Sequence, residues 1–346
     1  METKNLKEAM FYEKLGDGKV KCLLCPHTCT IADNKVGICK VRRNIGGTLY
    51  ATTYQKASAV AIDPIEKKPL FHFFPGSHVL SYGGVGCNLK CRYCQNHHIS
   101  QATPDVYPLR NTGGPDRVLS VALRRACGGV AFTYNEPTVW YEFMYDTAKA
   151  VKEKGFYTAM VSNGYINPEP LKKLTPYIDA ANIDIKSITE EDYWSMSTAH
   201  MDPVLQTVDY LAKNDVLVEI TCLVVTGFND TEEKIRTMAR WIVDHTGPDT
   251  AFHLTRYHPD YLYTEPATSL DTLKMAYKVS KDEGLRYVYV GNTIMRRYAN
   301  TYCHNCNTLV VTREKAYARK NYRTVKGKPS CPSCGTQLPF VDKAVP

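Results

Sequence analysis

Three cysteines stand close together in the segment YGGVGCNLKCRYCQNHH, where Cys87, Cys91 and Cys94 form a C-x3-C-x2-C run. Three thiolates do not by themselves complete a structural zinc site, which is tetrahedral and closed by four ligands. They can hold three irons of a four-iron cluster and leave the fourth iron open to a small molecule. The alternative is a chance grouping of cysteines, or a zinc site that takes a fourth ligand from elsewhere in the chain.

A second group of cysteines lies near the end of the chain and has a different spacing. Two C-x2-C pairs, separated by 24 residues, are formed by Cys303, Cys306, Cys331 and Cys334. This pattern is typical of a zinc ribbon, in which each pair sits on a tight turn. Rubredoxin-like iron is the alternative, because tetrahedral sulfur sites accept either metal.

A third group, close to the start, has less decisive spacing and consists of Cys22, Cys25, Cys29 and Cys39. These thiols can bind zinc, hold an auxiliary [4Fe–4S] cluster or staple a loop, with His27 as a substitute ligand. In a reducing compartment such groups indicate metal or cluster ligands rather than disulfides. Cys127 and Cys222 stand alone in apolar stretches, and we expect both to be buried.

The composition is that of an ordinary globular protein, with 346 residues of which 44% are hydrophobic and 23% charged. No apolar stretch approaches the roughly 20 residues of a membrane span, and the N-terminus lacks the apolar segment of a secretory signal. We therefore expect a cytoplasmic protein that does not contact membranes. Residues 296–346 hold ten Lys or Arg and two Asp or Glu, so the net charge of +8 belongs to this segment. Its basic strip with tyrosines suits RNA or another acidic partner, or is simply a solvated loop on a zinc ribbon.

Short apolar runs alternate with amphipathic stretches along the middle of the chain. The predicted strands are His78–Tyr82, Gly129–Thr133, Phe156–Ser162, Ala180–Lys186, Val216–Val225, Ala251–Tyr257 and Arg286–Val290. The predicted helices are Pro115–Cys127, Thr138–Lys154, Pro168–Pro176, Pro203–Asn214, Thr231–His245 and Ser269–Glu283. This alternation predicts right-handed βαβ units and a parallel sheet covered on both faces.

Polar residues follow several successive strands in the segments FTYNEP, VSNGY, NIDIKS and RYH. A βα barrel places its chemistry at the carboxyl ends of many strands, whereas a doubly wound sheet concentrates it at one switch point. We therefore expect an α/β fold with a partial TIM barrel at residues 77–295. Around it we expect a Cys-rich metal or cluster module at 1–45, a β-rich connector at 46–76 and a basic zinc-ribbon-like module at 296–346.

The charged members of these segments are candidate site residues, because buried charges are costly unless they pair or bind a charged ligand. Asp184 and Lys186 are two apart and share one face of their strand, as do Arg256 and His258. The alternative is a network of buried ion pairs and, for Glu136, stabilisation of the next helix N-terminus. In the connector, the charged residues are either functional or form a turn between two strands: Glu66, Lys67, Lys68 and His72.

The run C-x3-C-x-aromatic-C after the first strand resembles the cluster-binding motif of the radical S-adenosylmethionine (SAM) superfamily. FTYNEP, VSNGY, NIDIKS and RYH stand where glycyl-radical-enzyme activases, such as pyruvate formate-lyase activating enzymes, carry their SAM-contacting stretches. Over nearly its whole length the chain is similar to the radical SAM enzyme of the AmmeMemoRadiSam system. The matching stretches are CLLCPHTC, PIEKKPLFHFFPGS, the cysteine loop, FTYNEPTVWYEF, SNGYI and CPSCGTQLP. FTYNEP departs from the GGE-type motif common elsewhere in the superfamily.

This resemblance implies a partial (βα)6-type barrel of the radical SAM type and a [4Fe–4S] cluster on Cys87, Cys91 and Cys94. It implies that SAM binds the open iron and is cleaved by one electron to methionine and a 5′-deoxyadenosyl radical, which abstracts hydrogen from a substrate. The resemblance also implies the contacts with SAM. Glu136, with Thr133 and Asn135, is expected near the ammonium, and Asp184 and Lys186 near the carboxylate and ribose. Ser162 and Asn163 are expected near the ribose or cluster, Tyr93 near the adenine, and His258 near the adenosyl end.

The resemblance also implies partners: a reductant such as flavodoxin or ferredoxin, and Memo-like and AMMECR-like proteins. Two substrate classes stay open, a protein glycine as for the activases, or a small molecule or different macromolecule handled with those partners. We favour the second, because the whole-chain resemblance points that way. A zinc-ribbon protein that binds nucleic acid, with the barrel as scaffold, is the alternative from another class. It explains the position of the positive charge but not the three-cysteine loop.

Overall fold

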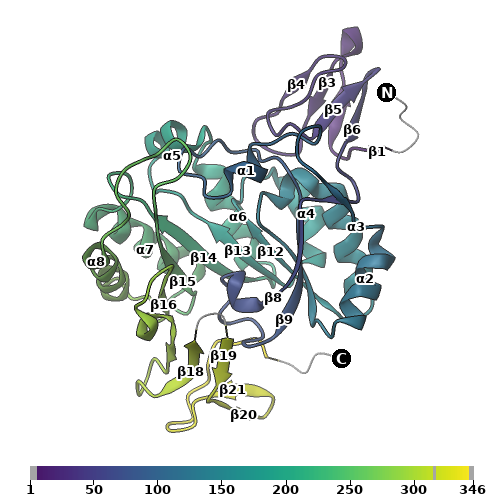
Figure 1. Ribbon diagram of the computed structural model, residues 1–346. Coiled ribbons are helices and arrows are strands. Elements are labelled where there is room, and N and C mark those ends of the chain that lie inside the picture. Colours follow the sequence, from purple (N-terminus) through teal and green to yellow (C-terminus); the bar gives the residue numbers. More distant parts are fainter. Residues whose placement is uncertain (1–5, 315–316, 343–346) are drawn as a thin grey trace.

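The computed structural model describes residues 6–314 and 317–342 and is built around one eight-stranded sheet (Figure 1). The strand order is β16-β15-β14-β13-β12-β11-β9-β8. Every pair from β9 to β16 in this order is parallel, and β8 adds an antiparallel edge. The strands are β8 (Ala59–Pro64), β9 (His78–Gly83), β11 (Gly129–Phe132), β12 (Tyr157–Ser162), β13 (Ala180–Asp184), β14 (Leu217–Val224), β15 (Phe252–Arg256) and β16 (Val288–Gly291).

The sheet is curved, and the helices that join the parallel strands pack on its outer face (Figure 1). They are α2 (Pro115–Arg124), α3 (Tyr141–Lys152), α4 (Pro168–Leu174), α6 (Asp202–Ala212), α7 (Glu232–Thr246) and α8 (Leu270–Asp282). Side-chain caps fix where two of them begin, because Thr231 and Ser269 accept the N–H three residues on. Every predicted strand and helix is present, and two short helices were not predicted, α1 (His97–Ser100) and α5 (Glu190–Ser197).

The sheet is an open arc between its two edge strands. Among the strands of the described ranges, no pairing joins β8 to β16. The core therefore lies between the sheet and the outer helices, where strand residues such as Val130, Ile183 and Leu254 are fully buried. This arrangement confirms the predicted α/β fold, and the sheet is open between β8 and β16 within the described residues.

The segment between β8 and β9 fills the amino-terminal end of the arc. It begins with the short helix η3 (Ile65–Lys67), which is the charged turn between two strands considered above. The Asn182 side chain donates to the Pro69 carbonyl at 2.8 Å, and the His72 N–H donates to Glu219 at 2.7 Å. These bonds fix the segment against β13 and β14, and it closes the end of the sheet opposite to the cysteine loop.

The C-terminal module packs beneath this segment, at the end of the molecule away from the N-terminus (Figure 1). It contains β17 (Thr301–Tyr302), β18 (Leu309–Glu314), β19 (Tyr317–Lys320), β20 (Arg323–Val325) and β21 (Lys328–Ser330). Arg313 donates to the Phe71 carbonyl at 2.7 Å, and the Val341 N–H donates to the His72 carbonyl at 2.8 Å. Residues 315, 316 and 343–346 of the predicted module lie outside the described residues.

The N-terminal module consists of two small antiparallel sheets at the other end of the molecule. One contains β1 (Lys7–Glu8), β6 (Thr48–Ala51) and β5 (Arg42–Ile45), and the other β2 (Tyr12–Lys14), β3 (Val20–Cys22) and β4 (Thr30–Ile31). Arg42 reaches Glu142 on α3 at 3.0 Å, and each side chain is 1% exposed. This buried pair anchors the module to the barrel. Residues 1–5 of the predicted module lie outside the described residues.

No helix within residues 6–314 and 317–342 is both long enough and apolar enough to cross a membrane.

Candidate active site

The loop after β9 brings Cys87, Cys91 and Cys94 to the wall of one cavity, of about 370 Å³, at the carboxyl end of the sheet. Each sulfur has a polar neighbour: Ser197 Oγ at 3.3 Å from Cys91, Ser100 Oγ at 3.2 Å from Cys94, and Asn163 Nδ2 at 3.7 Å from Cys87. Burial raises the pKa of the Cys87 and Cys91 thiols, so ligation of iron there releases protons. The site offers three ligands that share one open space.

The start of the loop is braced by Asn135 from the FTYNEP segment. Its Oδ1 accepts the Gly84 N–H at 2.9 Å, and its Nδ2 donates to the Gly86 carbonyl at 2.8 Å. Gly86 has a φ of +85°, and a Cβ there would lie 2.3 Å from the Cys39 carbonyl oxygen. Only glycine fits this position, because the loop passes so close to the N-terminal module.

Glu136 has protein donors on both carboxylate oxygens. Oε1 accepts the Thr138 N–H and the Ser162 hydroxyl, each at 2.8 Å, and Oε2 accepts the Asn163 N–H at 2.8 Å. Burial raises the pKa of this carboxyl, although these hydrogen bonds oppose the shift. The bond to Thr138 caps η4 (Pro137–Trp140), which is the helix-stabilising role considered as an alternative, and the other two bonds tie β11 to β12.

The fourth strand end presents a close ion pair to the same cavity. Lys186 Nζ donates to Asp184 at 2.8 Å, and both residues line the cavity wall. Burial by itself lowers the pKa of Lys186, but Asp184 and the nearby Cys91 raise it well above its ordinary value. A charged lysine therefore stands beside the cysteine loop, where it can balance negative charge.

The cavity gathers every predicted cluster and SAM residue except His258: Cys87, Cys91, Tyr93, Cys94, Thr133, Asn135, Glu136, Ser162, Asn163, Asp184 and Lys186. His258 is exposed, and its Nδ1 lies 2.9 Å from the Nε2 of Gln95, which does line the cavity. Arg256 instead donates to the Thr268 carbonyl at 2.7 Å. The structure thus brings together residues from the ends of β9, β11, β12 and β13, and it leaves His258 at the rim of the cavity.

Lys67 and Lys68 from the segment before β9 also line the cavity. Lys68 pairs with Asp63 at 2.7 Å, and Tyr134 donates to the same carboxylate. Burial raises the pKa of Asp63, but the Lys68 and Tyr134 hydrogen bonds outweigh it and lower the pKa to about 2. Sequence spacing gave no signal for Ser100 or Ser197, because their contacts with this site form only in the fold. Tyr134 lies in the FTYNEP segment, but its bond to Asp63 was not predicted.

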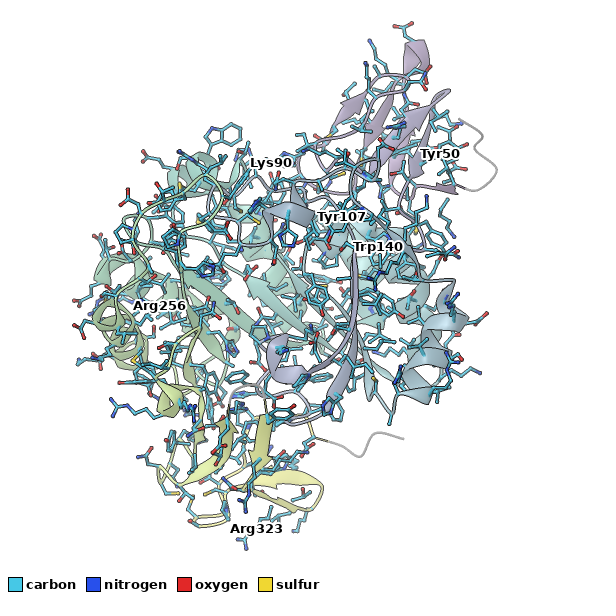
Figure 2. All side chains as sticks on the ribbon, viewed as in Figure 1. Tyr50, Lys90, Tyr107, Trp140, Arg256 and Arg323 are labelled. Atoms are coloured by element: carbon cyan, nitrogen blue, oxygen red, sulfur yellow. The ribbon has the colours of Figure 1, made fainter. Side chains whose placement is uncertain are left out.

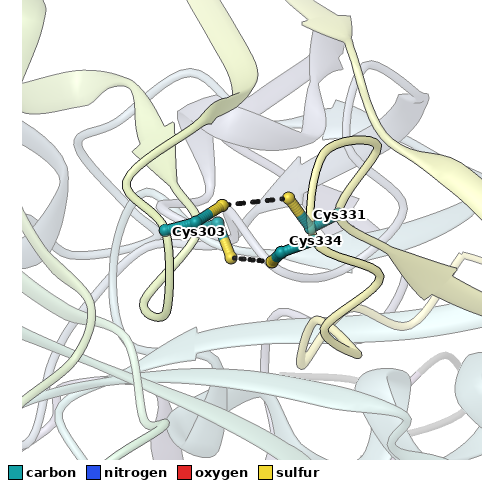
Figure 3. A group of neighbouring side chains, drawn as sticks. Cys303, Cys331 and Cys334 are labelled. Atoms are coloured by element: carbon teal, nitrogen blue, oxygen red, sulfur yellow. Dashed lines mark hydrogen bonds between the residues drawn. The ribbon is translucent and has the colours of Figure 1, made fainter.

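The C-terminal cysteines form a compact group of four sulfurs (Figure 3). All four lie within 4.8 Å of one another, with 3.7 Å between Cys303 and Cys334 and 3.5 Å between Cys306 and Cys331. Zinc–sulfur bonds of about 2.3 Å in a tetrahedron place ligand sulfurs about 3.8 Å apart. The donor set and spacing therefore fit one tetrahedral ion.

The N-terminal cysteines line a second cavity together with His27, Arg42 and Asn88. The two solitary cysteines, Cys127 and Cys222, are buried at 3% and 0% exposure, as predicted.

The family model of the radical SAM superfamily matches residues 82–242 of this chain. The chain is also 44% identical over 337 residues to the uncharacterized protein MJ0808 of Methanocaldococcus jannaschii, an alignment that covers 97% of this chain and 100% of that protein. This chain belongs to the radical SAM superfamily. The predicted superfamily is thereby confirmed.

Two further similarities concern activating enzymes. This chain is 26% identical over 180 residues to the pyruvate formate-lyase 1-activating enzyme of Escherichia coli strain K12. The alignment covers 50% of this chain and 71% of that enzyme. A domain of the pyruvate-formate lyase-activating enzyme from Bacteroides vulgatus superimposes with a TM-score of 0.43 and 21% identity, over 48% of this chain and 99% of that one. The family match and the sequence identity to the Escherichia coli enzyme make this protein a radical SAM enzyme related to glycyl-radical-enzyme activases. Its superfamily implies a [4Fe–4S] cluster, SAM and a reductant.

Proposed function

We propose that Cys87, Cys91 and Cys94 hold a [4Fe–4S] cluster at which SAM is cleaved by one electron. A flavodoxin or ferredoxin supplies the electron. The products are methionine and a 5′-deoxyadenosyl radical, which takes hydrogen from a substrate. The observation that supports this function best is the cavity of about 370 Å³ shared by the three cysteines and the polar ends of neighbouring strands. The cavity lies at the carboxyl end of the sheet, where folds of this kind place their chemistry.

Within this function we assign the charged side chains two kinds of role. Lys186, held by Asp184 at 2.8 Å, balances the negative charge of the SAM carboxylate and of the thiolate ligands. Glu136 is a positioning residue, because its oxygens already accept donors from Thr138, Ser162 and Asn163. In this role it sets the position of the Asn163 and Ser162 groups that face SAM.

For the substrate we propose a small molecule or macromolecule other than a glycyl-radical enzyme, handled with Memo-like and AMMECR-like partner proteins. The similarity of nearly the whole chain to the AmmeMemoRadiSam enzyme supports this choice. The alternative, a protein glycine, is supported by the 26% identity to the Escherichia coli activating enzyme over half of this chain. A glycyl-radical EPR signal on a candidate partner, formed only with SAM, reductant and this enzyme, would select the alternative.

We also propose that the C-terminal cysteines hold a structural zinc ion, which is supported by their mutual spacing within 4.8 Å. The exposed basic residues of this module, among them Arg323 at its tip (Figure 2), lie at the end of the molecule opposite to the cavity. Arg313 of the same strip is 2% exposed and donates to the Phe71 carbonyl, so it stabilises the interface with the barrel. The strip is therefore separate from the proposed chemistry.

The function is tested by EPR on anaerobic, dithionite-reduced protein before and after addition of SAM. SAM ligation of the open iron should change the spectrum of the cluster, and the Cys91→Ala variant should lack that SAM-responsive signal. A wild-type signal that SAM leaves unchanged, in protein with full iron content, would contradict the assignment.

A further inference from the structure

The cavity at the cysteine loop extends to a part of its wall that the proposed SAM contacts do not use. We call this part the lysine end, and it consists of Lys67, Lys68, Pro69 and Tyr134. The first three residues belong to the segment between β8 and β9, which closes the sheet opposite to the cysteine loop. A radical takes hydrogen only from a group held beside it, so a substrate must share this cavity with SAM. The lysine end is therefore a candidate binding site for the substrate.

The charges at the lysine end do not balance. Lys68 Nζ lies 2.7 Å from Asp63 Oδ2, and Lys67 Nζ lies 3.6 Å from Asp63 Oδ1. Neither lysine forms another ion pair within the described chain. One carboxylate thus faces two ammonium groups, which leaves a surplus of one positive charge. A negatively charged group of a ligand would balance this surplus through charge-assisted hydrogen bonds.

The two lysines differ in how firmly they are held. Lys68 is 2% exposed and donates a hydrogen bond to Asp63. The Lys67 side chain is 57% exposed, and its distance of 3.6 Å from Asp63 is too long for a hydrogen bond. The Lys67 ammonium donates no hydrogen bond to any other described residue. Its N–H donors are therefore available to a ligand in the cavity.

Tyr134 shows that the lysine end is held in a fixed and strained arrangement. Its φ of +72° is rare for a bulky side chain. In this conformation the Tyr134 hydroxyl donates to Asp63, and Lys68 Nζ lies 4.4 Å from the centre of the Tyr134 ring. A Cβ at Gly83 would lie 2.8 Å from Tyr134 Cδ2, so glycine makes room for the ring. Backbone strain of this kind occurs mainly at ligand and active sites.

From these observations we propose that the lysine end binds the carboxylate or phosphate group of a small-molecule substrate, and that Lys67 is the residue that determines this specificity. The bound anion directs the rest of the substrate toward SAM. The 5′-deoxyadenosyl radical then gains a hydrogen atom from a C–H bond and becomes 5′-deoxyadenosine, while the substrate carbon keeps the unpaired electron. The inference names the substrate class of the proposed function and rests on that function.

The test measures 5′-deoxyadenosine formed from SAM with dithionite by the wild type and three variants. Lys67→Gln removes the charge, Lys67→Arg keeps it, and Lys213→Gln removes the charge of an exposed lysine after α6 as the control. Small molecules from cells that make the protein are separated on an anion exchanger into a retained and an unretained fraction. The response of each protein is the ratio of product formed with and without a fraction.

We expect the retained fraction to stimulate the wild type and Lys213→Gln equally. Lys67→Gln should need about ten-fold more of this fraction for the same response, as loss of one charge-assisted hydrogen bond implies. Lys67→Arg should restore most of the response, which a purely structural loss at this position would not allow. Phosphatase treatment of the fraction should abolish the stimulation if the anion is a phosphate monoester and preserve it if the anion is a carboxylate.

A second measurement detects binding without SAM cleavage. The purified proteins are dialysed to equilibrium against the retained fraction, and the compounds enriched on the protein side are identified by mass spectrometry. The wild type and Lys213→Gln should enrich the same anionic compound, and Lys67→Gln should not.

Stimulation by the unretained fraction alone would overturn this proposal, as would equal responses of Lys67→Gln and the wild type to the retained fraction. Stimulation by neither fraction, in protein that cleaves SAM without an addition, would also overturn it. Absence of 5′-deoxyadenosine under every condition, in protein with full iron content, would instead contradict the proposed function on which this inference rests.

Discussion

The Glu136 carboxylate accepts the backbone N–H of Asn163 at 2.8 Å, and this bond joins the carboxyl ends of the neighbouring strands β11 and β12. The Asn163 side chain then reaches the Cys87 sulfur at 3.7 Å and Asn88 at 2.9 Å. A carboxylate at one strand end is thereby connected to a cluster ligand through one intermediate residue.

Replacing Glu136 should therefore disturb the SAM site without removing the cluster. Glu136→Ala leaves the buried N–H groups of Thr138 and Asn163 without acceptors, a loss of about 1–3 kcal/mol each. We expect weaker SAM binding, measured by equilibrium titration, with iron content near that of the wild type. Glu233→Ala, on the exposed face of α7, is the control. Unchanged SAM affinity in Glu136→Ala would argue against the positioning role.

The Ser197 hydroxyl should tune the cluster, because it lies 3.3 Å from the Cys91 sulfur. Hydrogen bonds to ligand sulfurs stabilise the reduced, more negative state and so raise the reduction potential. Ser197→Ala should lower the midpoint potential and retain the iron, as measured by EPR-monitored redox titration. Ser195→Ala, exposed on the same helix, should leave the potential unchanged. Equal potentials in both variants would show that this contact has no influence.

Removing the C-terminal ligands should release a metal without harming the barrel site. The Cys303→Ser and Cys306→Ser double variant should lose about one zinc ion per chain. The module packs on the amino-terminal end of the sheet through Arg313 and Phe71, away from the cavity. We therefore expect the loop cluster and SAM cleavage to persist, as followed by iron analysis and product chromatography. Loss of cleavage in a folded variant would mean that this module contributes more than structure.

The buried side chain of His72 should make the free energy of unfolding depend on pH. Burial lowers the pKa of His72 to about 4, and the charge of Arg313 adds to the shift, although Glu219 opposes it. Between about pH 6.5 and pH 4 the unfolded chain binds a proton that the folded chain excludes. This contribution is complete above pH 6.5 and is lost as the pH falls through that window, by at most about 3 kcal/mol. Urea unfolding at pH 7 and pH 5 should show a smaller drop for His72→Gln than for the wild type. An identical drop would contradict this prediction.

The strands were predictable because each is a short apolar run buried on both faces, and the site was partly predictable because parallel strands end at one edge. Asp184 and Lys186 illustrate this, since a spacing of two placed them on one face and the structure pairs them at 2.8 Å. The partners of Glu136 were not predictable. Ser162 and Asn163 lie on another strand, and only the pairing of β11 with β12 brings their donors to its carboxylate.

Contacts between separate parts of the chain could not be predicted from the sequence either. Ser197 is 106 residues from Cys91 along the chain, and α5, which carries it, was not predicted. The position of the C-terminal module depends on buried bonds from Arg313 and Val341 to backbone groups near His72, and spacing within the chain carries no signal for such bonds. The resemblance implied that His258 approaches the adenosyl end of SAM. In the structure His258 lies at the rim of the cavity, with its Nδ1 2.9 Å from the Nε2 of Gln95.

The central claim is tested most directly by formation of 5′-deoxyadenosine from SAM by anaerobically reconstituted protein with a strong reductant, beside the Cys91→Ala variant. The wild type should produce 5′-deoxyadenosine and methionine, and the variant should produce neither. A protein that binds neither an iron–sulfur cluster nor SAM, or a Cys91→Ala variant that cleaves SAM as well as the wild type, would contradict the assignment of Cys87, Cys91 and Cys94.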